Sequence, residues 1–305
     1  MKGKLYLTIS IFFTGLAFFG CNPNKTPVRL ATYTYATNDR VGNLKLLSQE
    51  LENRLERKVK TTSYPDVESL IEGIKSNDVD IALINTLGYL MLSSDNKHMI
   101  PLANMHIKKG AVDNYKTVFL TTNDSVKDLY ELKERAKTLR IMFVKEGSTS
   151  GNLVPRLFLS AMDIPSPESE FKEVKYGGTH TSTFEKLMRG ETDLCAIGSS
   201  EYYKQIQADS TFKNKVRLLW VSDEIPLGPV LINKAFSSEE KEIVSNLLLN
   251  MHTENIDAFE SIKLGWSEAK QADMFQLISD EYYNSFREVD GNRTHLDNIL
   301  QMFIN

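Results

Sequence analysis

The chain has 305 residues, of which 41% are hydrophobic and 25% charged, and its formal net charge is −4 at pH 7. This composition is typical of a folded protein with one large domain or two smaller ones, and it argues against disorder. The acidic balance argues against nucleic acid or an anionic membrane surface as a partner. A bound anion would therefore have to be recognised by well-aimed neutral donors more than by bulk charge.

The N-terminus, residues 1–21, is predicted to be an export signal. Two lysines precede an apolar stretch at residues 5–19, which is followed by a small residue and Cys21. This ending resembles the lipobox of bacterial lipoproteins, although Phe18 stands where Leu is usual. The resemblance implies that Cys21 is acylated and that the protein is lipid-anchored in the cell envelope, facing the periplasm. Secretion after cleavage and an uncleaved anchor are the alternatives, but the apolar stretch is short for a membrane span.

Two distant segments, residues 69–85 and 182–198, share one pattern. Each predicts a helix, a polar turn, an aspartate and a short apolar strand with a polar end, and Asp80 of the first matches Asp193 of the second. Short strands that are apolar on both faces are typical of a mostly parallel sheet covered by helices. The repeat therefore predicts an α/β fold with two similar lobes, and a single doubly wound domain is the alternative.

Further strands are expected in both halves, at residues 28–33, 115–121, 139–144, 216–221 and 230–233. We expect residues 22–115 plus 223–305 to form lobe 1 and residues 116–222 to form lobe 2. From Ser237 onward the chain is predicted to be helical, with Ser237 as an N-cap.

A run of small residues, Gly-Ser-Thr-Ser-Gly at 147–151, follows the expected strand 139–144. Ser150 is predicted to cap the next helix, and Pro155 fits its first turn. Several backbone N–H groups and hydroxyls would then converge at a positive helix end, which suits an anion. A tight, well-capped turn without a ligand is the alternative.

In open α/β sheets a ligand lies beyond the carboxyl ends of the strands. Asn85 with Thr86, Ser199 with Ser200, and the turn at 147–151 all follow predicted strands. We therefore expect these segments to meet at one ligand site.

Taken in chain order, the motifs resemble the substrate-binding proteins of phosphonate, phosphite and phosphate ABC transporters, the PhnD-like family. The stretches that carry the resemblance are residues 79–84 with Tyr89, 115–120, 147–155, 178–180 with 190–193, 225–229, and 264–266. The resemblance implies a type II periplasmic-binding-protein fold, in which two α/β lobes joined by a hinge close on a ligand. It also implies a monomeric binding protein without catalysis or cofactor, which delivers a small phosphorus-containing oxyanion to a membrane permease.

The same resemblance implies the site residues. Ser148, Thr149 and Ser150 would hold the oxyanion at the helix N-terminus, His180 would join them, and Tyr115 would be a cleft tyrosine. Four further residues complete the predicted site: Gly151, Asn85, Thr86 and Tyr33. Tyr33 and its neighbour Tyr35 either line the cleft or pack in the fold.

The part of the site that would hold the ligand's tail is less complete. Family members that bind 2-aminoethylphosphonate use two carboxylates, of which one matches Glu201 while the other falls on Gly228. Asn85 and Thr86 also replace a Gly-Pro pair that is common in the family. We therefore predict a phosphorus oxyanion and leave its tail open.

Other chemistries fit the sequence less well. A nucleophile elbow needs Ser where Thr149 stands, and no Lys follows Gly151 as in a phosphate-binding loop of nucleotide hydrolases. The histidines are scattered without metal-ligand spacing, and Cys195 is expected to be a buried, inert thiol. The remaining alternative is a lipid-anchored sensor that presents a related small anion to a membrane receptor.

Overall fold

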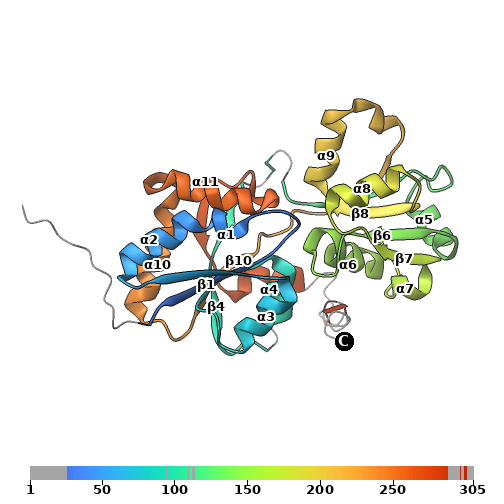
Figure 1. Ribbon diagram of the computed structural model, residues 1–305. Coiled ribbons are helices and arrows are strands. Elements are labelled where there is room, and N and C mark those ends of the chain that lie inside the picture. Colours follow the sequence, from blue (N-terminus) through green and yellow to red (C-terminus); the bar gives the residue numbers. More distant parts are fainter. Residues whose placement is uncertain are drawn as a thin grey trace, which may run out of the picture.

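The computed structural model describes residues 26–93, 95–108, 110–111, 114–287, 296 and 299–300. The predicted export signal and Cys21 lie outside these described residues. Figure 1 shows two lobes side by side, each built on its own sheet with helices packed against it. The predicted α/β class is confirmed by these two sheets and the helices packed against them.

The first lobe contains a six-stranded sheet with the order β11-β4-β10-β3-β1-β2. Strand β1 pairs in parallel with β2 and β3, whereas β10 is antiparallel to both β3 and β4. Its strands are β1 (Val28–Tyr33), β2 (Val59–Tyr64), β3 (Ile81–Leu83), β4 (Met99–His106), β10 (Pro229–Asn233) and β11 (Met274–Leu277).

The second lobe contains a five-stranded sheet with the order β7-β6-β8-β5-β9. Here β6 pairs in parallel with β7 and β8, and β5 is antiparallel to both β8 and β9. Its strands are β5 (Thr117–Thr121), β6 (Arg140–Phe143), β7 (Glu173–Tyr176), β8 (Leu194–Gly198) and β9 (Arg217–Val221). In each sheet, therefore, three neighbouring strands are parallel and the next strand, β10 or β5, is antiparallel. This antiparallel strand is the one by which the chain enters the sheet from the other lobe.

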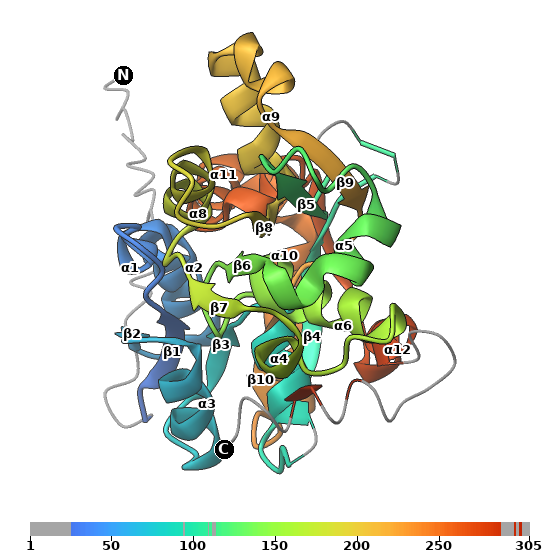
Figure 2. The ribbon, with the colours of Figure 1, turned by 90° about the vertical axis from the view of Figure 1, so that its right-hand side faces the viewer.

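Helices cover the sheets of both lobes (Figures 1 and 2). Those described in the first lobe are α1 (Arg40–Asn43), α2 (Lys45–Leu55), α3 (Val67–Lys75), α4 (Thr86–Ser93), α10 (Ser238–Glu254), α11 (Ile256–Gly265) and α12 (Asn284–Arg287). Those described in the second are α5 (Leu129–Arg135), α6 (Val154–Ala161), α7 (Pro167–Glu170), α8 (His180–Met188) and α9 (Ser199–Ala208). The predicted cap at Ser237 is confirmed, because Ser237 and Glu240 form a reciprocal capping box at the start of α10.

The repeat seen in the sequence corresponds to the same ion pair in each lobe. Asp80 accepts hydrogen bonds from the Arg29 guanidinium at 3.0 and 2.8 Å and from the Arg29 backbone N–H at 2.8 Å. Asp193 accepts the equivalent three bonds from Arg140 at 3.0, 3.0 and 2.9 Å. Each aspartate therefore ties the start of its own strand to the neighbouring parallel strand, at the edge opposite the carboxyl ends.

The chain passes between the two sheets from β4 to β5 and from β9 to β10. These two connections lie side by side, since the Ile225 N–H donates to the carbonyl of Tyr115 at 2.8 Å. Among the described residues, no helix is both long and apolar enough to cross a membrane.

The lobes also touch on the side of the turn at 147–151. Asn85 donates from Nδ2 to the Gly147 carbonyl at 2.8 Å, and the Leu87 N–H donates to Thr149 Oγ1 at 3.0 Å. Leu153 and Leu157 of the second lobe belong to the same apolar cluster as α3 and α4 of the first. This is a closed arrangement, with polar and apolar contacts joining the two lobes.

Candidate functional site

The small-residue turn opens a helix, but not at the predicted residue. Ser148 is the N-cap, and its Oγ accepts a hydrogen bond from the Gly151 N–H at 3.1 Å. The first turn, η2 (Thr149–Leu153), has the wider π-helical geometry and leads directly into α6. Because the helix starts earlier than expected, the predicted cap at Ser150 is wrong, and Ser150 lies inside the turn with a hydroxyl that does no capping.

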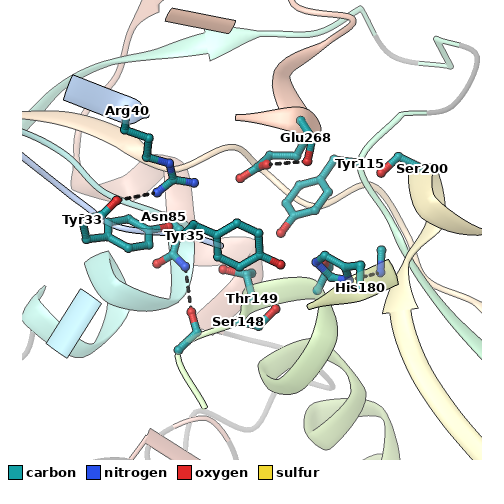
Figure 3. Close-up of a pocket in the computed structure, with 14 residues that line it drawn as sticks. Tyr33, Tyr35, Arg40, Asn85, Tyr115, Ser148, Thr149, His180, Ser200 and Glu268 are labelled. Atoms are coloured by element: carbon teal, nitrogen blue, oxygen red, sulfur yellow. Dashed lines mark hydrogen bonds between the residues drawn. The ribbon is translucent and has the colours of Figure 1, made fainter. Parts of the chain in front are cut away.

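A cavity lies between the lobes at this turn (Figure 3). The space available to the centres of water molecules is about 30 Å³, which suits a small ligand group. The lining residues come from both lobes: Tyr33, Tyr35, Arg40, Asn85, Tyr115, Gly147, Ser148, Thr149, Ser150, His180, Gly198, Ser200, Ser267 and Glu268. Seven of the ten predicted ligand residues are in this set, whereas Gly151, Thr86 and Glu201 are not.

Gly151 supports the turn from behind. A Cβ at this position would lie 2.3 Å from Val144 Cγ2, so a side chain there would force the strand and the turn apart. Its N–H is the one that Ser148 caps. Gly151 therefore shapes the donor-rich turn without lining the cavity.

His180 begins α8 and presents one ring nitrogen to the cavity. Its Nδ1 accepts a hydrogen bond from the Gly198 N–H at 2.9 Å, so the neutral ring carries its proton on Nε2. Burial lowers the pKa of His180 to about 4, against a small opposing effect of the Glu201 charge. At neutral pH the imidazole is therefore an uncharged donor, with its Nε2–H not used by the Gly198 contact.

Two buried hydroxyls at the cavity, Tyr35 Oη and Ser150 Oγ, form no hydrogen bond of good geometry with the described residues. Ser150 lies beside the Tyr115 hydroxyl, and Tyr35 lies beside the backbone of His180. Burial, followed by the negative charge of Glu268, raises the pKa of both Tyr35 and Tyr115. The tyrosine hydroxyls therefore keep their protons and can donate. Because a buried polar group without a partner is costly, these orphaned hydroxyls indicate a place for a hydrogen-bonding ligand.

Arg40 is a site residue that sequence reasoning missed. Its side chain is buried, lies 4.4 Å from the Tyr33 ring centre and 4.5 Å from the Trp266 ring centre, and donates from Nε to the Gly265 carbonyl at 2.9 Å. No carboxylate in the described residues lies within ion-pair distance of it. A buried cation held by aromatic rings and carbonyls gives the cavity a positive charge for an anion.

Glu268 is the second residue that was missed. It lies in η4 (Ser267–Ala269) of the first lobe and is the one carboxylate among the lining residues. In Figure 3, Arg40 and Glu268 face Ser148, Thr149 and His180 from the opposite side of the cavity. The first lobe thus supplies the charged groups and the second lobe supplies small neutral donors.

Comparison with known proteins identifies the family of this chain. Residues 33–277 match the family described as "ABC transporter, phosphonate, periplasmic substrate-binding protein". The chain belongs to this family. Its members are extracytoplasmic substrate-binding proteins of ABC transporters and are not enzymes, as the resemblance in the sequence implied.

Two relatives in the phosphonate-binding family share about a quarter of their residues with this chain. The "Probable ABC transporter phosphite binding protein PhnD1" of Prochlorococcus marinus (strain MIT 9301) is 23% identical over 240 residues, covering 74% of this chain and 79% of the relative. The "Phosphonates-binding periplasmic protein" of Escherichia coli (strain K12) is 24% identical over 248 residues, covering 81% of this chain and 72% of the relative.

Solved structures confirm the predicted type II periplasmic-binding-protein fold. The PhnD1 protein of Prochlorococcus marinus in complex with methylphosphonate superposes with a TM-score of 0.67 at 18% identity, covering 86% of this chain and 96% of that one. XAC2383 from Xanthomonas citri bound to chloride superposes with a TM-score of 0.70 at 16% identity, covering 91% of this chain and 98% of that one.

The carboxylate that matches the family's tail subsite is not among the residues that line the cavity, although its charge is close enough to act on His180. Glu201 sits in the first turn of α9, where Gln205 donates to its Oε1 at 2.6 Å and Lys204 lies 3.7 Å from its Oε2. Position 228 has no room for the second family carboxylate, because a Cβ there would lie 1.9 Å from the Ile84 carbonyl oxygen. Both halves of the family's amine-binding pair are thus absent from the cavity lining.

The side chains of Asn85 and Thr86, which replace the family's Gly-Pro pair, form hydrogen bonds within the protein. Asn85 accepts from the Gly88 N–H at 2.8 Å while its Nδ2 bridges to Gly147, so both ends of its amide are used. The Thr86 hydroxyl donates to the Pro226 carbonyl at 2.6 Å. These residues hold the first lobe's edge and the closed contact, and only Asn85 lines the cavity.

Metal chemistry has no support in the part of the chain that the structure describes, since no cluster of three or more His, Cys, Asp or Glu side chains could hold an ion there. Cys195 is fully buried in β8, and burial raises the pKa of its thiol. This is the inert environment that the sequence predicted for it.

Proposed function

We propose that this protein is a lipid-anchored, extracytoplasmic receptor that captures a phosphonate, phosphite or phosphate-like oxyanion between its lobes and delivers it to an ABC permease. The anion would lie against the turn at 148–150 and the ring of His180. The observation that carries this proposal is the pair of buried hydroxyls without partners, Tyr35 Oη and Ser150 Oγ, beside the free Nε2–H of His180.

The energetics of such a site are sufficient. A hydrogen bond to a charged group contributes roughly 1.5–3 kcal/mol, and the cavity offers several neutral donors together with Arg40. A micromolar complex requires about −8 kcal/mol. Four or five donors at the upper end of this range supply about 12–15 kcal/mol, which leaves that much after an association cost of about 4 kcal/mol.

The ligand is tested by calorimetric titration of a soluble fragment that begins after Cys21, unfolded and refolded to remove any carried-over ligand. The titrants are phosphate, phosphite, methylphosphonate, 2-aminoethylphosphonate and sulfate. We expect tight binding of at least one phosphorus oxyanion. Folded protein that binds none of them would contradict the proposed ligand class.

Two substitutions test the placement of the anion. Ser150→Ala and His180→Gln should each weaken binding at least tenfold, or by about 1.4 kcal/mol, because each removes or displaces a donor at the oxyanion. Ser210→Ala, at an exposed serine of the same lobe, is the matched control and should bind as the wild type does. Unchanged affinity in both site variants would remove them from the site.

The anchor is tested separately with the full-length chain in membranes. Cys21→Ser should move the protein from the membrane fraction to the soluble fraction, because the acylated side chain is lost. Continued membrane association of this variant, with the signal cleaved, would count against lipid anchoring and leave the ligand proposal untouched.

A further inference from the structure

Glu268 raises a question that the proposed function leaves open, which is why an oxyanion site contains a carboxylate. Among the described residues the one hydrogen bond recorded for its side chain is a long contact of 3.5 Å from the Ser267 hydroxyl. No lysine or arginine of the described chain lies within ion-pair distance of it. Glu268 therefore has no structural partner that would account for its position.

The cation across the cavity is committed elsewhere. The Arg40 guanidinium donates to the carbonyls of Gly265 and Tyr33 and stacks between the Tyr33 and Trp266 rings. It balances the total charge of the cavity without forming an ion pair with Glu268. The carboxylate oxygens of Glu268 thus remain acceptors that are available to a ligand.

The surroundings of Glu268 make its charge effective. Besides the main cavity, it lines a second, small cavity whose other walls are mostly apolar: Leu83, Ile84, Met105, Leu227, Gly228, Pro229, Val230, Trp266 and Phe275. Apolar walls screen a charge poorly, so a carboxylate at this boundary interacts strongly with whatever enters the cleft. The raised pKa values of Tyr35 and Tyr115 are in part a result of this charge.

A carboxylate can only accept hydrogen bonds, so it repels an anion that has no proton to offer and attracts one that has. We propose that Glu268 is the specificity-determining residue of the cleft and that it requires a hydrogen-bond donor on the bound anion. This inference rests on the proposed function. The donor is either a P–OH group of the monoprotonated head or an ammonium group on the tail, and fully ionised sulfonates and sulfate are rejected.

Glu268 thereby replaces the missing carboxylates of the family's tail subsite from a different element. Glu201 is engaged with Gln205 on α9, and position 228 cannot hold a side chain. η4 lies in the first lobe, facing the anion-binding turn of the second (Figure 3). One ligand group can therefore meet the hydroxyls on one side while its donor meets Glu268 on the other.

The test compares ligands of equal shape at neutral pH. Wild-type protein is titrated with methylphosphonate and with methylsulfonate, which lacks an ionisable proton at that pH. We expect at least a 100-fold preference for the phosphonate. Glu268→Gln, whose amide can also donate, should reduce this preference at least tenfold by gaining affinity for the sulfonate. Glu260→Gln, an exposed glutamate on neighbouring α11, is the charge-matched control and should keep the wild-type preference.

A second arm identifies the source of the donor. If Glu268 accepts a hydrogen bond from the ammonium group, wild type should bind 2-aminoethylphosphonate at least tenfold tighter than ethylphosphonate. Glu268→Gln should then abolish that difference. If Glu268 accepts a hydrogen bond from the P–OH group, the two ligands should bind with equal affinity, and methylsulfonate should still bind much more weakly than methylphosphonate. Either result supports the requirement for a donor.

Three results would overturn the inference. Equal wild-type affinity for methylphosphonate and methylsulfonate, together with equal affinity for 2-aminoethylphosphonate and ethylphosphonate, does so without any variant. A preference that Glu268→Gln leaves unchanged does so as well. A preference that is lost in Glu201→Gln instead would assign the selection to the family's usual position. If folded wild type binds no phosphonate at all, the proposed function itself has failed, which is a different outcome from failure of this inference.

Discussion

The two lobes share a scaffold but contribute different chemical groups to the cavity between them. Their sheets share an arrangement of three parallel strands and two further strands, with one more edge strand in the first lobe. Each sheet has the same arginine–aspartate pair, Arg29 with Asp80 and Arg140 with Asp193. At the cleft, however, the second lobe offers small neutral donors on a helix N-terminus, whereas the first offers a cation, a carboxylate and aromatic rings. The repeated elements hold the fold, and the chemistry that distinguishes one ligand from another comes from segments outside the repeat.

The largest expected effect comes from removing the first lobe's cation. Arg40→Gln should weaken binding of the tightest phosphorus oxyanion by about 100-fold, near 2.7 kcal/mol, because the cavity loses its positive charge. Arg40→Lys keeps the charge and should lie between this variant and wild type. Arg54→Gln, a surface arginine paired with Glu254, is the control. Calorimetry that finds Arg40→Gln equal to wild type would show that the neutral donors of the second lobe suffice alone.

The equivalence of the two scaffolds is tested by making the same substitution in the arginine–aspartate pair of each lobe. Asp80→Asn and Asp193→Asn should each lower the free energy of unfolding by about 2 kcal/mol, between the values for exposed and buried pairs, because both ion pairs are part-buried. Asp78→Asn, at a mostly exposed carboxylate 3.8 Å from Arg29, should cost less than about 0.5 kcal/mol. Denaturant titration that gives clearly unequal costs for the two lobes would break the equivalence of their scaffolds.

The second lobe should also carry a pH dependence of stability that comes from His180. The pKa of His180 is lowered to about 4, below its ordinary value, so between these two values the unfolded chain binds a proton that the folded chain does not. The free energy of unfolding therefore falls as the pH falls, by about 1 kcal/mol between pH 7.5 and pH 5.5 for the ligand-free protein. His180→Gln, which can still accept from Gly198, should lose this part of the slope. Parallel pH profiles for the two proteins would contradict the assigned neutral ring.

The smallest effect is expected at the contact between the lobes. Thr149→Val removes the acceptor of the Leu87 N–H, an otherwise unpaired donor at the start of α4, and should favour opening of the ligand-free protein by less than about 1 kcal/mol. Small-angle scattering should show a larger radius of gyration for this variant. Thr149→Ser retains the oxygen and should scatter as wild type does; expansion in both would mean that the hydroxyl is not the contact that matters.

The sequence predicts those parts of the scaffold whose signals are local. It does not predict β2, β4, β7 or β11, and the expectation that the chain is helical from Ser237 onward is wrong at β11, which forms an edge strand on β4. Short apolar strands after Asp80 and Asp193 define the two sheets, and the Ser237–Glu240 pair defines the start of α10. The donor-rich turn is also visible, since five small residues between a strand and a helix have few other structural uses. The residues alone do not show at which residue of the turn the helix begins, because capping preferences do not reveal that its first turn is π-helical.

The missed residues belong to segments with no periodic signal. Arg40 begins a helix of four residues, and Glu268 sits in a turn of three, so neither stands out as a site until the fold brings it to the cleft. Trp266, two residues before Glu268, was part of the family resemblance and was the nearest available clue. Glu201, by contrast, was predicted from the family resemblance but does not line the cavity, and Gln205 one turn later on α9 donates to its carboxylate.

The absence of a side chain at Gly147 allows the two lobes to approach each other closely at the turn 147–151. A Cβ there would lie 2.5 Å from Cγ1 of Val67, which belongs to the other lobe, while the Gly147 backbone is not in the left-handed region that requires glycine. A methyl group at this position would therefore leave each lobe's fold intact and obstruct only their meeting. The size of this one residue would therefore shift the balance between the open and closed arrangements of the two lobes, while the hydroxyls and the His180 ring of the cavity stay unchanged.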